Sequence, residues 1–286
     1  MGLFSSYFTK PGPGVDKDAP EKLRIWQFFE IFWGQLSKLC LLNMIYFVAA
    51  LPLIFGIYLC FELKVDAPLF VAVRTIDGVA TMDLAGLILI VVSIFVTFPA
   101  TLGFTFVIRN IQRREHAWIW HDFIKHTKAN YKKGVINGIV TLIVYYLLFN
   151  AHAMYYSQTM FPSTRINSFL AILMVAFIIG FTWAQFYINT MIVTFDLKLR
   201  HIYKNAFIFA ISKIPLNILI TIICLILGLG LYVLSLIIPV LGILITLLIL
   251  FSLFGFIIIF CVYPTIDKYM ITVAEESAEI EEEKEE

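Results

Sequence analysis

Long apolar segments alternate with short polar ones along most of the chain. Six of these segments are long enough for a membrane-spanning helix, which needs ~20 residues, and none carries an Asp, Glu, Lys or Arg in its interior. Transmembrane β-strands would instead show ~10-residue alternating segments between turns. We therefore predict an all-α integral membrane protein with six transmembrane helices, at about 39–61, 84–108, 134–155, 168–195, 215–238 and 240–263.

The segments outside these spans differ in character. Residues 1–38 hold a Pro- and Gly-rich linker and then an aromatic, partly amphipathic stretch, which we expect to run along the inner membrane interface. Pro52 interrupts the first span and should kink its helix or break its hydrogen-bond ladder. The loop at 62–83 is long enough to hold a short helix outside. Residues 264–286 form an acidic tail ending EESAEIEEEKEE, a run typical of solvated tails.

Two basic stretches, 109–133 and 196–214, follow the second and fourth spans. In the first of them, aromatic and apolar residues recur at three- and four-residue spacing with polar residues between them. This pattern predicts an amphipathic helix from about Ala117 to Tyr131. We expect the helix to lie flat under the membrane with its aromatic face among the headgroups. The residues on that face are Trp120, Phe123, Ile124, Thr127 and Tyr131.

The distribution of charge predicts the sidedness of the chain. The chain is 60% hydrophobic and only 14% charged, whereas roughly a quarter of the residues in a soluble domain are charged. Of its 21 Lys and Arg residues, 18 lie in the two ends and the two basic stretches, and the other three lie in loops on the opposite side. Because Lys and Arg favour the cytoplasmic side, we expect both termini and both basic stretches to be cytoplasmic.

The segment IRNIQRREHAWIWHDFIKHTKANYKKG, residues 108–134, resembles the hallmark of the YesL family of bacterial membrane proteins. In that family a basic segment leads into an aromatic–Asp–Phe motif and then a "K.N..K" run. The corresponding residues here are Trp120, Asp122 and Phe123, followed by Lys128, Asn130 and Lys133. The opening KPGPGV and the ranges 41–52 and 194–207 are also similar to family stretches. Many members continue the Leu-Pro of the first span with Thr-Ile-Gly, whereas this chain has Leu-Ile-Phe-Gly, so a role for that threonine does not carry over.

The resemblance implies a multi-pass protein of the bacterial cytoplasmic membrane, but no settled biochemical activity. It also implies an association with carbohydrate-uptake loci, beside binding-protein-dependent importers of oligosaccharides. Our working hypothesis is an accessory or regulatory component of an ABC-type oligosaccharide uptake system, with the permease subunits as candidate partners.

The first basic stretch and its predicted helix are the candidate contact surface. Aromatic residues set among cations suit either a protein partner or the anionic headgroups of the lipid bilayer. The candidate residues are Arg113, Arg114, Trp118, Trp120, Asp122, Phe123, Lys128, Lys132 and Lys133.

A second candidate site lies within the membrane. Its polar residues either hydrogen-bond between helices or line the binding site of an autonomous small-molecule transporter, which is the alternative function. A large cavity that joins Asn43, Asn137 and Gln185 would favour transport, and a closed apolar bundle would favour the accessory role. The candidate residues are Asn43, Asn137, His152, Gln185 and Asn189.

Catalytic signatures are absent from the sequence. It has no HExxH, GxSxG or GxxxxGK[ST] motif and no intramembrane carboxylate pair, so we expect no enzyme, cofactor or nucleic-acid partner. The four cysteines form no CxxC pair. Asp122 and His126 are four residues apart, a spacing that suits half a metal site or a surface pair, and we expect no metal. The chain also lacks a nucleotide-binding cassette and the Glu-Ala-Ala coupling pattern of importer permeases, so we do not assign it as the permease itself.

Overall fold

The computed structural model describes residues 23–62, 73–76, 79–82, 84–157 and 160–271, and it divides into two units with the boundary after Gly34. The described part of the first unit is one helix, α2 (Arg24–Gly34), which carries the exposed Trp26 and Trp33 side chains. This helix occupies the aromatic stretch that we predicted before the first span. The predicted linker and most of the acidic tail lie outside the described residues.

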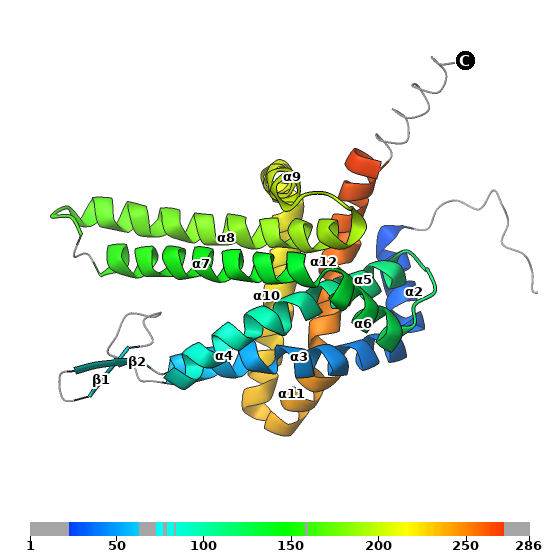
Figure 1. Ribbon diagram of the computed structural model, residues 1–286, viewed down its shortest axis with the longest axis horizontal. Helices are drawn as coiled ribbons and strands as arrows, with labels where there is room; N and C mark the ends of the chain where they lie inside the picture. The colour runs from blue at the N-terminus through cyan, green and yellow to red at the C-terminus, as the bar shows by residue number, and fades with distance from the viewer. Residues whose placement is uncertain (1–22, 63–72, 77–78, 83, 158–159, 272–286) are drawn as a thin grey trace, which may run out of the picture. The chain divides into compact units, whose positions relative to one another are not determined.

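The second unit is a bundle of helices (Figure 1). Two of its segments are single π-helical stretches, labelled η. In chain order the helices are α3 (Leu36–Glu62), α4 (Leu84–Phe95), α5 (Thr97–Gln112), α6 (Ile119–Ala129), α7 (Tyr131–Tyr156), α8 (Thr164–Thr194), α9 (Leu199–Ser212), α10 (Ile214–Ile237), α11 (Pro239–Ile245), η1 (Thr246–Leu250), α12 (Phe251–Ile266) and η2 (Asp267–Ile271).

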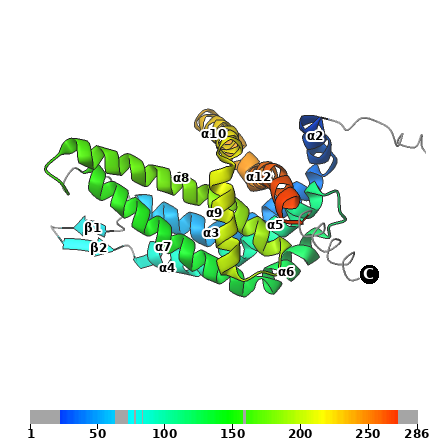
Figure 2. The ribbon, with the colours of Figure 1, turned by 90° about the horizontal axis from the view of Figure 1, so that it is seen from above.

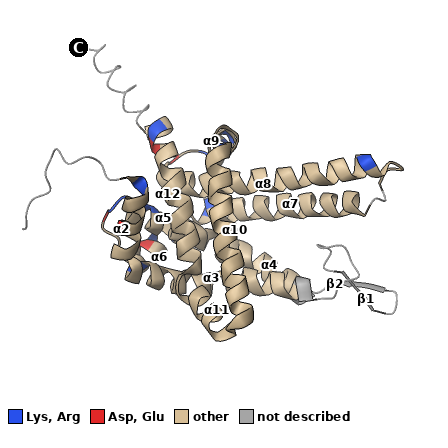
Figure 3. Ribbon diagram, turned by 180° about the vertical axis from the view of Figure 1, so that it is seen from behind, with Lys and Arg blue, Asp and Glu red and all other residues tan. Residues whose placement is uncertain are grey.

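The predicted membrane architecture is confirmed. Among the described residues, five helical segments are long and apolar enough to cross a membrane, and the pair α4–α5 makes a sixth if its two halves are taken as one bent span. Figure 3 shows the long helices free of charge over most of their lengths, with Lys and Arg at helix ends and in connections. The side of the membrane on which the termini lie stays a prediction.

The break in the spans falls at Val96 and not at Pro52. The axes of α4 and α5 differ by 45°, whereas α3 continues through Pro52 as one helix. A proline inside a helix frees backbone carbonyls, and Ser or Thr side chains of neighbouring helices often bind them. Here the hydroxyl of Thr97 donates a 2.8 Å hydrogen bond to the carbonyl of Ala49, in the turn before Pro52.

Helix α5 is the most enclosed element, with 12 of its 16 residues buried. It contacts α3, α6, α7, α8 and α12. Small residues let these helices approach closely, as is usual in membranes. A Cβ placed on Gly134 of α7, for example, would lie 2.7 Å from the Cα of Pro99. The bundle is therefore organised around the helix that leads into the first basic stretch.

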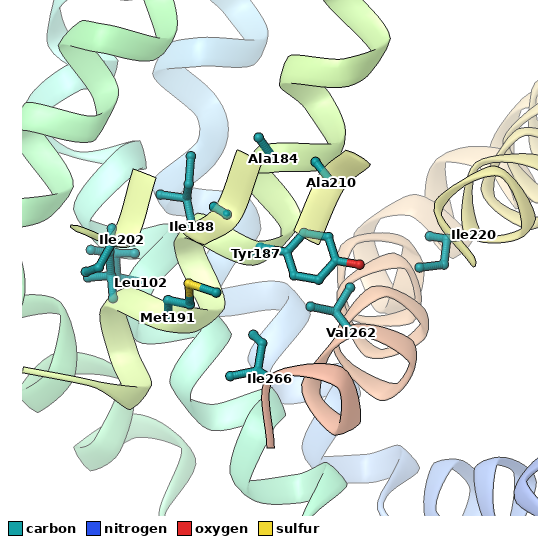
Figure 4. Packing of buried hydrophobic residues seen from close by; sticks show 12 residues of the cluster. Leu102, Ala184, Tyr187, Ile188, Met191, Ile202, Ala210, Ile220, Val262 and Ile266 are labelled. Carbon is teal, nitrogen blue, oxygen red and sulfur yellow. The ribbon is translucent and has the colours of Figure 1, made fainter. Parts of the chain in front are cut away.

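The main hydrophobic cluster joins α5, α8, α9, α10 and α12 (Figure 4). Tyr187 of α8 lies at its centre, and its hydroxyl donates to Asn217 of α10 at 3.0 Å. The Asn217 amide in turn donates to the carbonyl of Ala210 at 3.0 Å. These bonds fix the turn between α9 and α10, and Figure 2 shows α9 crossing α8 instead of running parallel to it.

A short β-hairpin lies between α3 and α4, where we expected room for a helix. Strand β1 (Val73–Ile76) pairs antiparallel with β2 (Val79–Met82), with Val73 opposite Met82. The strand sequences are rich in β-branched residues, and the intervening sequence is Asp-Gly. That combination is the strongest short-range hairpin signal, so the sequence carried the information against a helix.

Candidate functional site

Helix α6 packs closely on α5 through one glycine. A Cβ on Gly103 would overlap the Thr127 hydroxyl and come within 2.5 Å of the Phe123 carbonyl oxygen. Ile119 and Phe123 of α6 are buried, and Phe123 is only 4% exposed. The prediction of Phe123 as a headgroup or partner contact is therefore wrong, because its ring is enclosed by the protein.

The start of α6 is fixed by Asp122. Its Oδ2 atom accepts a 2.8 Å hydrogen bond from the backbone N–H of Trp118, the residue that precedes the helix. Such a bond satisfies a donor that a helix N-terminus leaves free. The carboxylate has this local structural role within the surface that we proposed, and it does not pair with His126 within the described residues.

The two tryptophans of this segment point outward. Trp118 is 69% exposed and Trp120 is 64% exposed, while the neighbouring Ala117 and Ile119 are buried. Exposed tryptophans beside cations suit a protein interface or the headgroup layer of a membrane. Of the aromatic residues that we predicted to contact headgroups or a partner, Trp118, Trp120 and Tyr131 are exposed, whereas Phe123 is buried.

Three lysines form a stripe on the exposed side of this region. All three are exposed, Lys125 and Lys128 on α6 and Lys132 in the first turn of α7. None of the three has a carboxylate partner within the parts of the chain that the structure describes. Two other predicted cations are paired, Arg113 with Glu115 and Lys133 with Asp196, each at 3.0 Å. We call Lys125, Lys128 and Lys132 the lysine stripe.

Arg114 occupies an unusual backbone position. Its φ of 58° is left-handed, a conformation that usually requires glycine. The N–H groups of Arg114 and Glu115 bond to the carbonyls of Ile111 and Asn110 at 3.1 and 2.9 Å, which is the Schellman arrangement that ends a helix. The chain thus keeps an arginine where glycine would be less strained, at an exposed position.

Arg109 is a residue that the sequence reasoning missed. It is 8% exposed, and its Nη1 atom donates to the Val193 carbonyl at 2.8 Å and to the Thr194 hydroxyl at 3.2 Å. Its guanidinium carbon lies 4.6 Å from the centre of the Phe106 ring. The charge sits at the C-terminus of α8, where the helix dipole favours a cation. We had counted Arg109 only as one of many basic residues, since sequence does not show which cation turns inward.

His126 lies against the same phenylalanine. Its ring stacks on Phe106, with ring centres 3.2 Å apart. Burial lowers the pKa of His126 from its ordinary value of 6.5, and the nearby Asp122 carboxylate opposes this shift. The imidazole is thus held in its neutral form near neutral pH. Within the described residues no three His, Cys, Asp or Glu side chains are placed to hold a metal ion.

Asn43 is a structural link and does not belong to a shared polar site. Its Nδ2 donates to the carbonyls of Thr246 and Leu247 at 3.0 and 2.7 Å, and its Oδ1 accepts from the N–H of Ser252 at 3.0 Å. These backbone groups belong to and follow η1, where π-helical bonding leaves groups without their α-helical partners. Both amide hydrogens of Asn43 are used, so none remains for a substrate.

Three other predicted polar residues do come together. Asn137 of α7 donates to Gln185 at 3.2 Å and to Asn189 at 3.1 Å, both on α8. The Tyr203 hydroxyl of α9 donates to the Asn137 Oδ1 atom, a partner that we did not predict. Burial raises the pKa of Tyr203 to about 12, which keeps the phenol protonated as a donor. We call Asn137, Gln185, Asn189 and Tyr203 the polar cluster.

His152 lies apart from the polar cluster, near the other end of α7. Its Nδ1 atom is 3.1 Å from the Ala171 carbonyl of α8. A hollow of about 450 Å³ between α8, α10 and α12 is lined mainly by apolar side chains, with Thr182 and Thr221 as its hydroxyl groups. Neither Asn43 nor the polar cluster lines this hollow. The structure thus brings together three of the five predicted membrane residues and leaves Asn43 and His152 elsewhere.

Residues 39–151 match a protein family described as "Protein of unknown function, DUF624". The match covers α3 to most of α7, and so includes α6 and Asn137, but it covers less than half of the chain. The proteins of this family are uncharacterised and are often called YesL-like. Neither the curated proteins nor the solved structures yield a match to the chain. The comparisons and the apolar helices together indicate a multi-pass integral membrane protein.

Proposed function

We propose that this protein is an accessory or regulatory component of a bacterial ABC-type uptake system for oligosaccharides. In this proposal it lies in the cytoplasmic membrane with both termini in the cytoplasm and binds the permease subunits of the importer. The carbohydrate part rests on the resemblance of residues 108–134 to the YesL family, with which the match of residues 39–151 agrees.

The observation that carries the accessory role is the exposure of Trp118 and Trp120 beside the lysine stripe. Aromatic residues of this kind supply much of the binding energy in protein interfaces. Neighbouring cations add electrostatic steering and specificity. The apolar residues around the tryptophans, Ile119 and Phe123, are already buried against the bundle. The tryptophans therefore remain for a partner or for the headgroup layer.

The polar groups in the membrane support the same proposal. Asn43 bonds to the backbone of η1, and Asn137 bonds to three side chains of the polar cluster. Polar groups that are hydrogen-bonded between helices stabilise helix packing, typically by ~1 kcal/mol each. Their donors are then not free to bind a transported solute. An accessory subunit needs no solute pathway of its own.

The test is a mild-detergent pull-down of the tagged protein from its native membrane, with mass spectrometry of the captured proteins. We expect sugar-importer permeases with the wild type and at least a tenfold loss with the double variant Trp118→Ala, Trp120→Ala. The matched control is Tyr156→Ala with Phe169→Ala, two exposed aromatics at the other end of α7 and α8. Absence of importer subunits from the wild-type sample, or equal capture by the tryptophan variant, would overturn the proposal.

A second candidate function, autonomous transport of a small molecule, is favoured by one observation. The Gln185 Nε2 and Thr141 Oγ1 atoms are buried and have no hydrogen-bond partner within the described residues. Such groups are uncommon and could bind a polar solute. Uptake into proteoliposomes that contain only this protein, reduced by Gln185→Ala, would establish transport. No uptake above protein-free vesicles would exclude it for the solutes tested.

A further inference from the structure

The lysine stripe has the charge and the exposure of a docking surface for an acidic peptide. Lys125, Lys128 and Lys132 are all exposed, while Ile119 and Phe123 face the bundle. Their amines have no carboxylate partner in the described parts of the chain. A group of unpaired cations attracts anions, and the attraction is strongest for a ligand that carries several negative charges.

The chain carries such a ligand at its other end. Residues 275–286 contain eight Glu and one Lys. The range 113–133 contains six Lys or Arg against two acids, and two of those six cations already have partners, in the Arg113–Glu115 and Lys133–Asp196 pairs. The excess charges of the two segments are therefore opposite in sign and complementary.

We propose that the acidic segment 275–286 binds the lysine stripe of the same chain and competes there with the partner. The competition with a partner rests on the proposed function, because that function supplies the partner that binds this surface. The contact between the segment and the stripe is independent of that function and can be measured without a partner.

The end of α12 lies close enough for this contact. The guanidinium carbon of Arg113 is 5.6 Å from the centre of the Tyr263 ring, so the start of the basic region lies beside α12. From Tyr263 to Ile271, eight residues of helix span about 12 Å. The 15 residues after Ile271 can extend up to about 50 Å. The whole of α6, about 16 Å long, is within that reach.

Helix α9 also carries exposed cations, but its surface suits lipid better. Its exposed face includes Phe207, Ile208 and Ile211, which places that face against apolar surroundings. At its end, Lys213 already bonds to the Tyr269 hydroxyl at 3.1 Å. The lysine stripe carries no exposed aliphatic residue of this kind, so its charges are the more accessible to a water-borne peptide.

The strength of the contact follows from its exposure. Exposed ion pairs are individually weak and are screened by salt. A tethered segment, however, has an effective concentration in the millimolar range, so even weak binding occupies the stripe much of the time. We expect removal of residues 275–286 to raise the apparent affinity for the partner by about two- to tenfold.

The experiment uses the purified full-length protein in nanodiscs of phosphatidylcholine, with no partner present. A carbodiimide joins a carboxylate to an amine only when the two are in contact, and mass spectrometry identifies the joined residues. We expect links from the acidic segment to the lysine stripe, reduced at least fivefold in high salt. Mixing isotopically heavy and light protein separates links within one chain from links between two chains, and mixed-isotope links would overturn the same-chain assignment.

Charge exchange provides the matched controls. The triple variant Lys125→Glu, Lys128→Glu, Lys132→Glu should lose the links. Adding Glu281→Lys, Glu282→Lys and Glu283→Lys to this variant exchanges the charges and should restore links between the two segments. The control variant Lys198→Glu, Arg200→Glu, Lys204→Glu, on and next to α9, should leave the wild-type links unchanged. Absent wild-type links, or no links in the charge-exchanged protein, would overturn the proposal. If the links hold but no permease is ever captured, only the proposed function fails.

Discussion

The guanidinium of Arg109 donates a 2.8 Å hydrogen bond to the backbone carbonyl of Val193, 84 residues later in the chain. This bond joins the C-terminus of α5 to the C-terminus of α8. It places a buried cation at two helix ends whose carbonyls need donors. The buried cation thereby holds the ends of α5 and α8 together.

Arg109→Met should destabilise the protein. The variant leaves the Val193 carbonyl at the end of α8 without this donor, and a lost hydrogen bond to a charged group costs about 1.5–3 kcal/mol. We expect the apparent melting temperature in detergent to fall by several degrees. Arg113→Met, at an exposed position, is the matched control and should change it little. Equal effects of the two variants would contradict the supporting role of Arg109.

Gly103→Ala should weaken the docking of α6 on α5. The new Cβ would overlap Thr127 and crowd the Phe123 carbonyl, and overpacking of this kind costs about 1–3 kcal/mol. Amide hydrogen exchange in residues 119–129 should become faster. Gly180→Ala is the control, because a Cβ there meets nothing within 4 Å, and its exchange rates should match those of the wild type.

Arg114→Gly should separate stability from binding. Glycine relieves the left-handed backbone of this position, so the free energy of unfolding should rise by up to about 1 kcal/mol. Arg114→Ala removes the same cation and keeps the strain. Partner capture should fall in both variants, whereas the melting temperature should rise only in the glycine variant. A glycine variant that melts below the alanine variant would contradict the interpretation that the backbone of Arg114 is strained.

His126 should make stability depend on pH. Because its pKa in the folded protein is lower than the ordinary value of 6.5, the folded state favours the neutral imidazole. Its contribution is fully present above pH 6.5 and is lost as the pH falls through the lower, folded pKa. Melting temperatures from pH 7.5 to 5 should fall more steeply for the wild type than for His126→Gln. Parallel curves would show that another group is responsible.

The predicted sidedness can be tested with fusions. Because 18 of the 21 Lys and Arg residues lie on the predicted inner side, green fluorescent protein at the C-terminus should fluoresce. Alkaline phosphatase inserted after Phe161, between α7 and α8, should be active because it reaches the outside. A dark C-terminal fusion together with an inactive insertion would reverse the topology, and both basic stretches would lie outside.

Much of the fold could be predicted from hydrophobic runs, because a bilayer demands long apolar helices. The prediction failed where a contact with another helix determines the local structure. Pro52 does not break α3, and the turn before it is bound from another helix, where Thr97 donates to the carbonyl of Ala49. The hairpin at 73–82 is a different kind of failure, because its signal was present in the sequence and was not used.

The candidate site was less predictable, for a related reason. Spacing placed Phe123 and Trp120 on one aromatic face, but the face that turns inward is chosen by the gap that Gly103 leaves on α5. Likewise Asn43 and Asn137 looked alike in sequence. One binds a π-helical segment and the other binds three side chains, because tertiary packing positions their acceptors and donors.

The link between Asn43 and η1 has a consequence for the synthesis of the protein. Asn43 and Thr246 are 203 positions apart, and the chain is made from its N-terminus at about 5–20 residues per second. The amide of Asn43 therefore waits about 10–40 seconds for the carbonyls that complete its bonding. During that time the first span lacks the hydrogen bonds that join it to η1. A chain that stops before residue 246 leaves the amide of Asn43 without these two acceptors in its first transmembrane helix.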